Sequence, residues 1–241
     1  MGTVDGKDVV MQSSANAGSL YYNYKGTHSI VSMAVAGPDY ECVYADVGTT
    51  GRVSDGGAWN KCGLIKAIEV GTVVLSFGVQ KLPYVFVGDE AFALKKHMMK
   101  PYPQHDLTED KRVYNYRHSL ARRISENLFG ILASRWRVFR SVLLLPPDTT
   151  ELLVFTALGL HYFLRQSSSC GTYCPVGLVN QEQDGQVIPG ILRQQSPAEA
   201  FSPLNVPSTG HNASMDAKSV RETIKEYFFN EGSVDWQWDM C

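Results

Sequence analysis

The chain has 241 residues, of which 44% are hydrophobic and 11% aromatic, and its formal net charge is −2. This composition excludes a disordered chain and leaves enough apolar surface for a core. The five cysteines are scattered, and no basic and apolar leader follows Met1, which favours a reduced intracellular compartment. The longest apolar run, residues 152–164, is shorter than the roughly 20 residues of a membrane-spanning helix, so no membrane partner is expected.

The basic residues are concentrated in the middle of the chain. Residues 111–140 contain eight Lys and Arg against one acid, Glu126, whereas residues 141–241 contain eleven acids against five bases. This asymmetry predicts an anionic partner for the middle segment. A solvated, arginine-rich helix face is the alternative, and the charge pattern alone leaves both interpretations open.

Three strand-like stretches open the chain, at residues 3–12, 29–37 and 40–48. The short turn at Pro38-Asp39 predicts an antiparallel hairpin between the second and the third. Residues 53–71 then predict one short helix, with Ser54 and Asp55 as its capping pair. Residues 82–92 form an apolar run that includes a Gly-Asp step, which is typical of a strand buried on both faces and paired in parallel.

Helical patterns fill much of the second half. A long helix is expected over residues 108–139, capped by Asp106 or Thr108. Its main apolar stripe comprises Leu120, Ile124, Leu128 and Ile131. A second helix follows the double proline, over residues 146–166.

The order of elements predicts an α/β fold built on a mixed sheet. Three strands are expected to be antiparallel, with a fourth returning parallel beside the first and helices flanking the sheet. We expect one domain over residues 1–165, a poorly ordered Ser/Gly/Gln/Pro-rich linker over 166–210, and a C-terminal amphipathic helix and tail over 211–241. In such a sheet the functional crevice lies at the carboxyl ends of the inner strands.

Three carboxylates are placed to meet at that crevice. Asp5 lies on the first strand and Asp89 at the carboxyl end of the fourth, while Glu126 lies on the long helix, away from its apolar stripe. Converging carboxylates can hold one or two hard divalent cations and leave positions open for water and phosphate. Such ions stabilise the attacking and leaving oxygens of a displacement on a phosphodiester.

Each carboxylate also has an ordinary structural explanation. Asp5 beside Gly6 can make a turn, Asp89 can be a strand-end loop residue, and Glu126 can pair with Arg122 one turn earlier. On the pattern alone these explanations remain open.

Several spaced motifs resemble the PIF/Harbinger superfamily of DDE transposases and their derived nucleases. They include "DVGTTGRVSDGG", "YVFVGDEAF", "SLARRISENLFG" and "LHYFLR", together with the terminal "RETIKEYFFNEGSVDWQW". The resemblance implies an RNase H-like fold and metal-dependent DNA cleavage. It maps the family's catalytic, metal-binding carboxylates onto Asp5 in "VDGKD", Asp89 in "GDEAF" and Glu126 in "SENLFG", with 36 residues between the last two.

Two features depart from the family pattern. Asp8 stands where the family has a histidine, which adds a negative charge near the expected site. The family's helical DNA-binding region lies upstream of the first aspartate, so an amino-terminally truncated nuclease domain is expected. Asp46 and Asp55 resemble acids near the family's site, and we interpret Asp55 as a helix cap and Asp46 as structural.

The expected function is that of a DNA endonuclease dependent on Mg²⁺ or Mn²⁺. A truncated or domesticated relic that binds DNA or protein without cutting is the alternative. DNA is the expected partner, and a protein partner would supply DNA specificity or nuclear import; the nucleus is the expected location, with the cytoplasm as a second one. The arginines expected to hold the DNA backbone are Arg117, Arg122, Arg123, Arg135 and Arg137.

Overall fold

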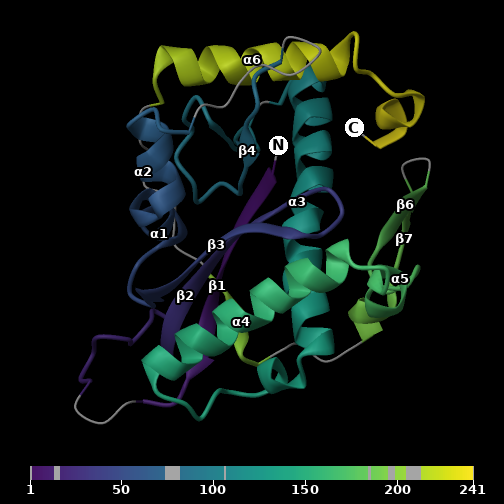
Figure 1. The fold of residues 1–241 in the computed structure, drawn as a ribbon. Coiled ribbons are helices and arrows are strands. Elements are labelled where there is room, and N and C mark those ends of the chain that lie inside the picture. Colours follow the sequence, from purple (N-terminus) through teal and green to yellow (C-terminus); the bar gives the residue numbers. More distant parts are fainter. Residues whose placement is uncertain are drawn as a thin grey trace.

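A mixed sheet forms the centre of the protein. The computed structural model describes residues 2–13, 17–73, 82–105, 107–183, 186–194, 199–204 and 213–240. The strand order is β3-β2-β1-β4-β5, and β8 also pairs with β1 (Figure 1). The strands of this sheet are β1 (Gly2–Met11), β2 (His28–Ala36), β3 (Cys42–Thr50), β4 (Phe86–Val87), β5 (Met98–Met99) and β8 (Phe201–Pro203).

Three long strands give the sheet its antiparallel half. β1 pairs with β2 over its whole length, from Thr3 opposite Ala36 to Met11 opposite His28. β2 pairs in turn with β3, through a tight connection in which Tyr40 has a positive φ of 62°. The alternation of β-branched and apolar residues in these stretches fits a sheet covered on both faces, and the three predicted strands are confirmed.

The fourth strand is parallel to β1, as predicted, but it is far shorter than expected. Gly2 lies opposite Phe86 and Thr3 opposite Val87, and β5 continues the parallel pairing beyond β4. Both residues of β4 are half-buried, so the prediction of a long strand buried on both faces is wrong. Chain residues 88–92 turn away because Asp89 starts a tight turn, in which the Phe92 N–H donates to the Asp89 carbonyl.

Helices cover both faces of the sheet. Val9 and Met11 of β1 pack with Leu128 and Leu132 of one helix and Leu158 of another. On the other face, Val4 and Met33 pack with Trp59 and Ile65. The helices are α1 (Asp55–Lys61), α2 (Gly63–Glu69), α3 (Glu109–Arg135), η1 (Arg137–Arg140), α4 (Pro147–Gln166), α5 (Cys170–Tyr173), η2 (Ile191–Gln194), α6 (Met215–Phe229) and η3 (Asp235–Met240).

The observed helices differ in detail from the predicted ones. Residues 53–71 form two helices, α1 and α2, which meet at Cys62. The long helix α3 ends at Arg135 and continues as the short η1, while Thr108 is its N-cap without a side-chain bond; Asp106 lies outside the described residues. Leu128 and Ile131 of the predicted stripe are buried, but Leu120 and Ile124 are only half-buried. α4 begins directly after Pro146, as predicted.

The described part of residues 166–204 is structured. α5, the β6–β7 hairpin (Gln181–Gln183 and Gln186–Ile188) and η2 follow α4, and β8 then pairs antiparallel with β1. Phe201 of β8 packs against the Phe129 and Phe139 rings, with centroids 5.5 and 4.7 Å away. The described residues of this segment thus have secondary structure, and the ring contacts of Phe201 and the pairing with β1 hold β8 on the sheet.

α6 lies across the beginning of α3, at the top of Figure 1. Ile224 is buried there with Tyr102 and Tyr114, and Val220 and Phe228 pack beside it. Lys225 forms an ion pair with Asp110 in the first turn of α3, at 2.5 Å. Residues 215–229 of the predicted C-terminal segment form this helix, and its apolar face packs against the rest of the chain.

Among the described residues, none of the helices combines the length and the apolar character that crossing a bilayer requires.

Candidate active site

The site begins with a gap along one edge of β1. On that edge β4 pairs with Gly2 and Thr3, and β8 pairs with Lys7, Asp8 and Val9. Of the chain that the structure describes, no strand pairs with residues 4–6 on this edge. The end of β4 and the start of α1 both point to this gap, which lies where a parallel strand diverges from its neighbour, the kind of place where α/β sheets bind ligands.

Asp5 lies in this gap. The whole residue is 6% exposed. Oδ1 accepts the N–H of Gly6 at 3.0 Å, and Oδ2 lies 2.7 Å from Nζ of Lys7, two residues further along the same face of the strand. This contact has the distance of an ion pair without the alignment of a hydrogen bond. Asp5 is therefore held on a rigid strand, with its charge balanced by one lysine.

Asp89 follows β4 by two residues. Because Thr3 lies opposite Val87, the parallel register carries Asp89 toward the level of Asp5. Oδ1 accepts the N–H of Ala91 at 2.9 Å. Burial raises the pKa of Asp89, and the Asp5 charge raises it further, while the Ala91 N–H and the Arg122 charge lower it. The register and this electrostatic influence relate Asp89 to Asp5, and their role as metal ligands stays a prediction.

A third carboxylate, Asp55, reaches the gap from α1. Its side chain is 2% exposed, and Ser54 is the helix cap, with Oγ accepting the N–H of Gly57 at 3.3 Å. The interpretation of Asp55 as the cap is therefore wrong. Burial raises the pKa of Asp55 to about 8, and the Asp89 and Asp5 charges add to the rise. The resemblance points to Asp55 as an acid near the family's site, but its local sequence does not predict the inward turn of the side chain, because its partners come from two distant segments.

Glu126 is not part of this group in the structure. It lies on the exposed side of α3, and its Oε1 accepts from Nη2 of Arg122 at 3.2 Å, with 49% of the Glu126 side chain exposed. Arg122 in turn acts electrostatically on Asp89. Arg122 thus links Glu126 to Asp89, and it forms with Glu126 the i, i+4 pair that their spacing allows.

Asp8 and Asp46 lie outside this group. Asp8 is fully buried, accepts from Oγ of Ser29 at 2.6 Å, and has a raised pKa because of its burial. Asp46 on β3 accepts from the Tyr44 hydroxyl at 3.4 Å. Asp8 alternates to the opposite side of β1 from Asp5 and Lys7, and Gly6 faces that same opposite side.

The predicted DNA-binding arginines have different surroundings. Arg117 stacks on Phe228 and Trp236 in the C-terminal segment, and Arg135 lies over the Tyr173 ring. Arg123 lines a polar pocket of about 460 Å³ with Asn127 and Asn180. Arg122 lies between Glu126 and Asp89, and Arg137 is exposed on η1.

The carboxylates suit a hard divalent cation in chemistry, but they do not form a finished metal centre. Within the described ranges, no three His, Cys, Asp or Glu side chains already stand together as a metal-binding group. Oδ1 of Asp55 nevertheless is buried without a hydrogen-bond partner there, and Asp5, Asp55 and Asp89 each bring carboxylate oxygens to the gap. Oxygen ligands of this kind are those that Mg²⁺ and Mn²⁺ prefer.

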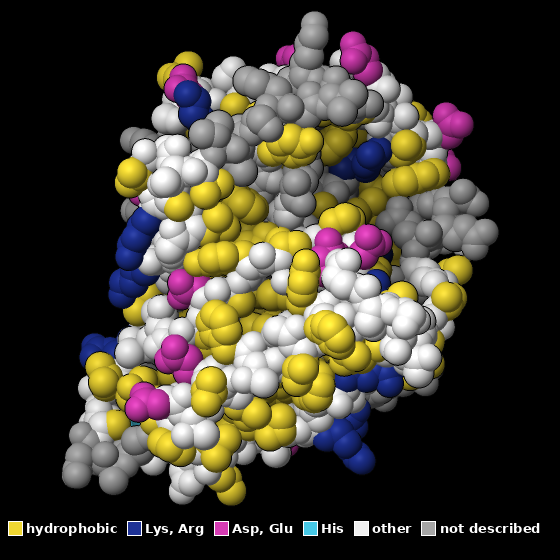
Figure 2. Space-filling view, viewed as in Figure 1, with side chains coloured by type: hydrophobic (Ala, Val, Ile, Leu, Met, Phe, Trp, Pro, Cys, Tyr) yellow, Lys and Arg dark blue, Asp and Glu magenta, His cyan; other side chains and the backbone are white. Residues whose placement is uncertain are grey.

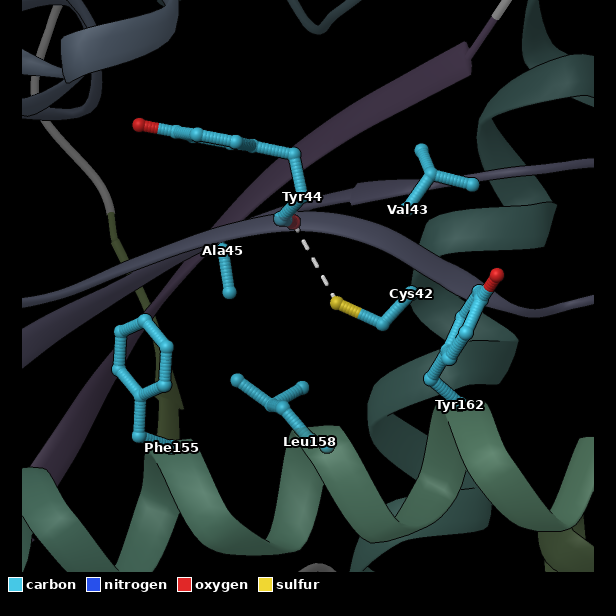
Figure 3. Close-up of a pocket in the computed structure, with 8 residues that line it drawn as sticks. Cys42, Val43, Tyr44, Ala45, Phe155, Leu158 and Tyr162 are labelled. Atoms are coloured by element: carbon cyan, nitrogen blue, oxygen red, sulfur yellow. Dashed lines mark hydrogen bonds between the residues drawn. The ribbon is translucent and has the colours of Figure 1, made fainter.

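A separate apolar pocket lies between β3 and α4. It has a volume of about 360 Å³, and Figure 3 shows Leu158 and Tyr162 of α4 beside Cys42 and Phe155 beside Ala45. Burial raises the pKa of the Cys42 thiol to about 12, and its Sγ donates to the Tyr44 carbonyl at 3.3 Å. Figure 2 shows hydrophobic side chains gathered over this part of the surface. The pocket offers no charged group, so it is not a site for phosphodiester chemistry.

A mixed sheet flanked by helices, with aspartates on its first strand and at the end of the parallel strand, defines an RNase H-like α/β protein. A model of the DDE superfamily endonuclease family matches residues 4–162, well over half of the chain. The chain belongs to this family. The predicted fold class and the resemblance to Harbinger-type DDE proteins are confirmed.

The chain is also similar to a curated plant protein. "Protein ALP1-like" of Arabidopsis thaliana is 25% identical over 170 residues, which make up 66% of this chain and 41% of that relative. The chain thus spans about two fifths of the length of the relative. No solved structure matches this chain.

Proposed function

We propose that this protein is a DNA endonuclease that cleaves phosphodiester bonds with Mg²⁺ or Mn²⁺. The observation that carries the proposal is the parallel register of β1 and β4, which brings Asp5 and Asp89 to the same gap. Membership of the DDE superfamily endonuclease family supports the reaction class. Two rigidly held aspartates from adjacent strands are the framework that such chemistry requires.

In this proposal Asp5, Asp89 and Glu126 hold the metal. When bound, the cation would activate a water or a 3′-hydroxyl and stabilise charge on the phosphate oxygens. Asp5 and Asp89 supply oxygen ligands from positions fixed by the Gly6 and Ala91 N–H groups. Glu126 joins them only if it leaves Arg122, and the freed guanidinium would then be available to a DNA phosphate.

The basic residues of α3 and η1 would bind the DNA backbone. Arg122 and Arg137 suit this role best, because one lies beside the carboxylates and the other is exposed. Phosphate contacts of this kind carry no sequence information. We therefore propose that a protein partner supplies DNA specificity or nuclear import, and that the protein acts in the nucleus.

A second candidate function is binding of DNA or protein without cleavage. The Lys7–Asp5 ion pair and the Arg122–Glu126 pair favour it, since each neutralises one of the expected metal ligands. Asp8, which replaces the family's histidine, also favours this second function. It is buried against Ser29 and offers the site no hydrogen-bond donor.

Nicking of supercoiled plasmid DNA separates the two functions. The endonuclease proposal expects relaxed circles in Mg²⁺ or Mn²⁺ and none in EDTA, with the Asp89→Asn protein inactive under all conditions. If the parent protein retards DNA in a gel but produces no nicks at any metal concentration, the binding function stands and the endonuclease proposal fails.

A further inference from the structure

Asp55 lies where no requirement of α1 places it. The cap of the helix is Ser54, so the N-terminal turn is satisfied without the aspartate. An aspartate at the first helical position usually stays in water, where it interacts favourably with the helix dipole. Here the side chain is instead 2% exposed and turns inward to the sheet.

The Asp55 carboxylate lies directly against the backbone of β1 at Gly6. A Cβ atom on Gly6 would stand 2.6 Å from Oδ1 of Asp55, so only glycine leaves room for the carboxylate there. Gly6 is the neighbour of Asp5, and its N–H donates to Oδ1 of that residue. The absence of a side chain at position 6 therefore allows Asp55 to approach the backbone of β1 next to the first aspartate, from the face of the strand opposite the Asp5 side chain.

The turn after Asp89 also fits closely around the start of α1. A Cβ atom on Gly56 would lie 3.2 Å from the carbonyl oxygen of Ala91, and the Ala91 N–H holds Oδ1 of Asp89. Thus residues next to Asp55 contact the same turn that positions Asp89. Two glycines, Gly6 and Gly56, let α1 bring Asp55 up to both of the other aspartates.

One carboxylate oxygen of Asp55 lacks a hydrogen-bond partner in this environment. Its Oδ1 is buried and has no hydrogen-bond partner in the part of the chain that the structure describes. The charged groups that act on Asp55 are Asp89, Asp5, Lys7 and Asp8, and Lys25 also interacts with it. A buried carboxylate oxygen that has no hydrogen-bond partner and lies among three other acids is unfavourable unless a cation binds there.

We propose that Asp55 is a further metal-binding carboxylate of the site and holds the divalent cation together with Asp5 and Asp89. This inference rests on the proposed function, because the cation it binds is that of the cleavage reaction. Asp55 contributes from α1 at the carboxyl edge of the sheet, and its unpartnered Oδ1 is the oxygen that the cation would meet. Asp55, Asp5 and Asp89 could then hold the cation while Glu126 is still paired with Arg122, and Glu126 would join them once it leaves the arginine.

Mn²⁺ binding by the whole chain tests the proposal without relying on activity. Electron paramagnetic resonance measures free Mn²⁺ directly, so the dissociation constant can be compared among the parent, Asp55→Asn and Asp46→Asn proteins. Asp46→Asn is the matched control, because it removes the same charge from a residue that bonds Tyr44 instead of the gap. We expect Asp55→Asn to weaken Mn²⁺ binding at least about tenfold, with Asp46→Asn within about twofold of the parent.

Thermal denaturation in EDTA separates ligand loss from misfolding. Asp55→Asn is expected to melt no lower than the parent, since burial disfavours the charged form of the carboxyl that the amide replaces. Asp55→Glu is expected to keep more of the Mn²⁺ affinity than Asp55→Asn does. An Asp55→Asn protein that melts well below the parent, or that binds Mn²⁺ as tightly as the parent, overturns the role of Asp55.

A comparison with Asp89→Asn separates the two proposals. If Asp89→Asn weakens Mn²⁺ binding and Asp55→Asn does not, the Asp55 inference fails while the proposed function stands. If the parent itself binds no Mn²⁺, the metal-dependent function fails, and the Asp55 inference fails with it.

Discussion

Nζ of Lys7 lies 2.7 Å from Oδ2 of Asp5, so the chain places its own cation beside the first aspartate. Both side chains are largely buried, with 17% and 9% of their surfaces exposed. Lys7 also lowers the pKa of Asp55, against the acids that raise it. One lysine thus offsets the mutual repulsion of several aspartates while no metal is bound.

Replacing Lys7 by Met should destabilise the protein in EDTA and make it more responsive to metal. Removing one partner of a largely buried pair leaves the other charge uncompensated, so the free energy of unfolding should fall by about 1–3 kcal/mol. Mn²⁺ should restore more stability to Lys7→Met than to the parent, because the ion then replaces the missing positive charge. Urea denaturation with and without Mn²⁺ measures both effects.

Lys96→Met is the control for that experiment. Lys96 pairs with Asp216 at 2.9 Å, but the side chains are 67% and 65% exposed. An exposed pair of this kind contributes less than about 1 kcal/mol. Equal unfolding free energies for Lys7→Met and Lys96→Met would show that Lys7 does not balance the aspartates.

The stability of the metal-free protein should fall as the pH rises from about 4 to about 8. The folded-state pKa of Asp55 is about 8, against an ordinary value of 3.8, so between these values the folded chain binds more protons than the unfolded chain. Stability then decreases with pH across that window, and the raised pKa of Asp89 acts in the same direction. Melting temperatures of the parent in EDTA should therefore drop more steeply with pH than those of Asp55→Asn. Parallel curves for the two proteins would contradict the buried, unbalanced position of Asp55.

Asp89→Asn should fold at least as stably as the parent without metal. The asparagine keeps an oxygen to accept the Ala91 N–H at the position where Asp89 accepts it at 2.9 Å, and it removes a charge that repels Asp5. Mg²⁺ should stabilise the parent more than the mutant. Differential scanning calorimetry in EDTA and in Mg²⁺ checks both points. A much lower melting temperature for the mutant in EDTA, with no metal-induced shift in the parent, would mean that Asp89 only holds the turn.

Replacing Arg122 and Arg137 by Ala should flatten the dependence of DNA affinity on salt. Each lost phosphate contact lowers the slope of log affinity against log salt by about 1. Lys66→Ala, on an exposed position of α2, is the control and should leave the slope unchanged. Fluorescence anisotropy with a random duplex at several salt concentrations gives the slopes, and an unchanged slope for Arg122→Ala/Arg137→Ala would show that this face does not meet DNA.

Much of the sheet could be predicted from local patterns. The alternation in residues 2–11 and 28–36, and the Gly-Asp step after an apolar run, are short-range signals, and they were sufficient to predict β1, β2 and the parallel approach of Asp89 to Asp5. β8 carries no such signal, because three residues in a Ser/Pro-rich stretch become a strand only through contact with Phe129, Phe139 and β1.

The side chains of the candidate site were harder to predict. The inward turn of Asp55 depends on Gly6, which is distant in sequence, and on Ala91 in a third segment. The contact of Glu126 with Arg122 is local, and it is the ordinary helical pair that the spacing had left open. Family resemblance maps Glu126 onto a metal ligand, whereas in the structure its carboxylate accepts a hydrogen bond from Arg122. The role of Glu126 as a metal ligand stays a prediction.

The most direct test of the account is whether the parent chain cuts DNA through Asp5 and Asp89. Supercoiled plasmid is incubated with the parent, Asp5→Asn, Asp89→Asn and the control Asp46→Asn, in Mn²⁺ and in EDTA, after calorimetry has shown that all four fold. We predict metal-dependent nicking by the parent and by Asp46→Asn, and none by Asp5→Asn or Asp89→Asn. Equal nicking by the parent and Asp89→Asn, or no nicking by a folded, DNA-binding parent, would contradict it.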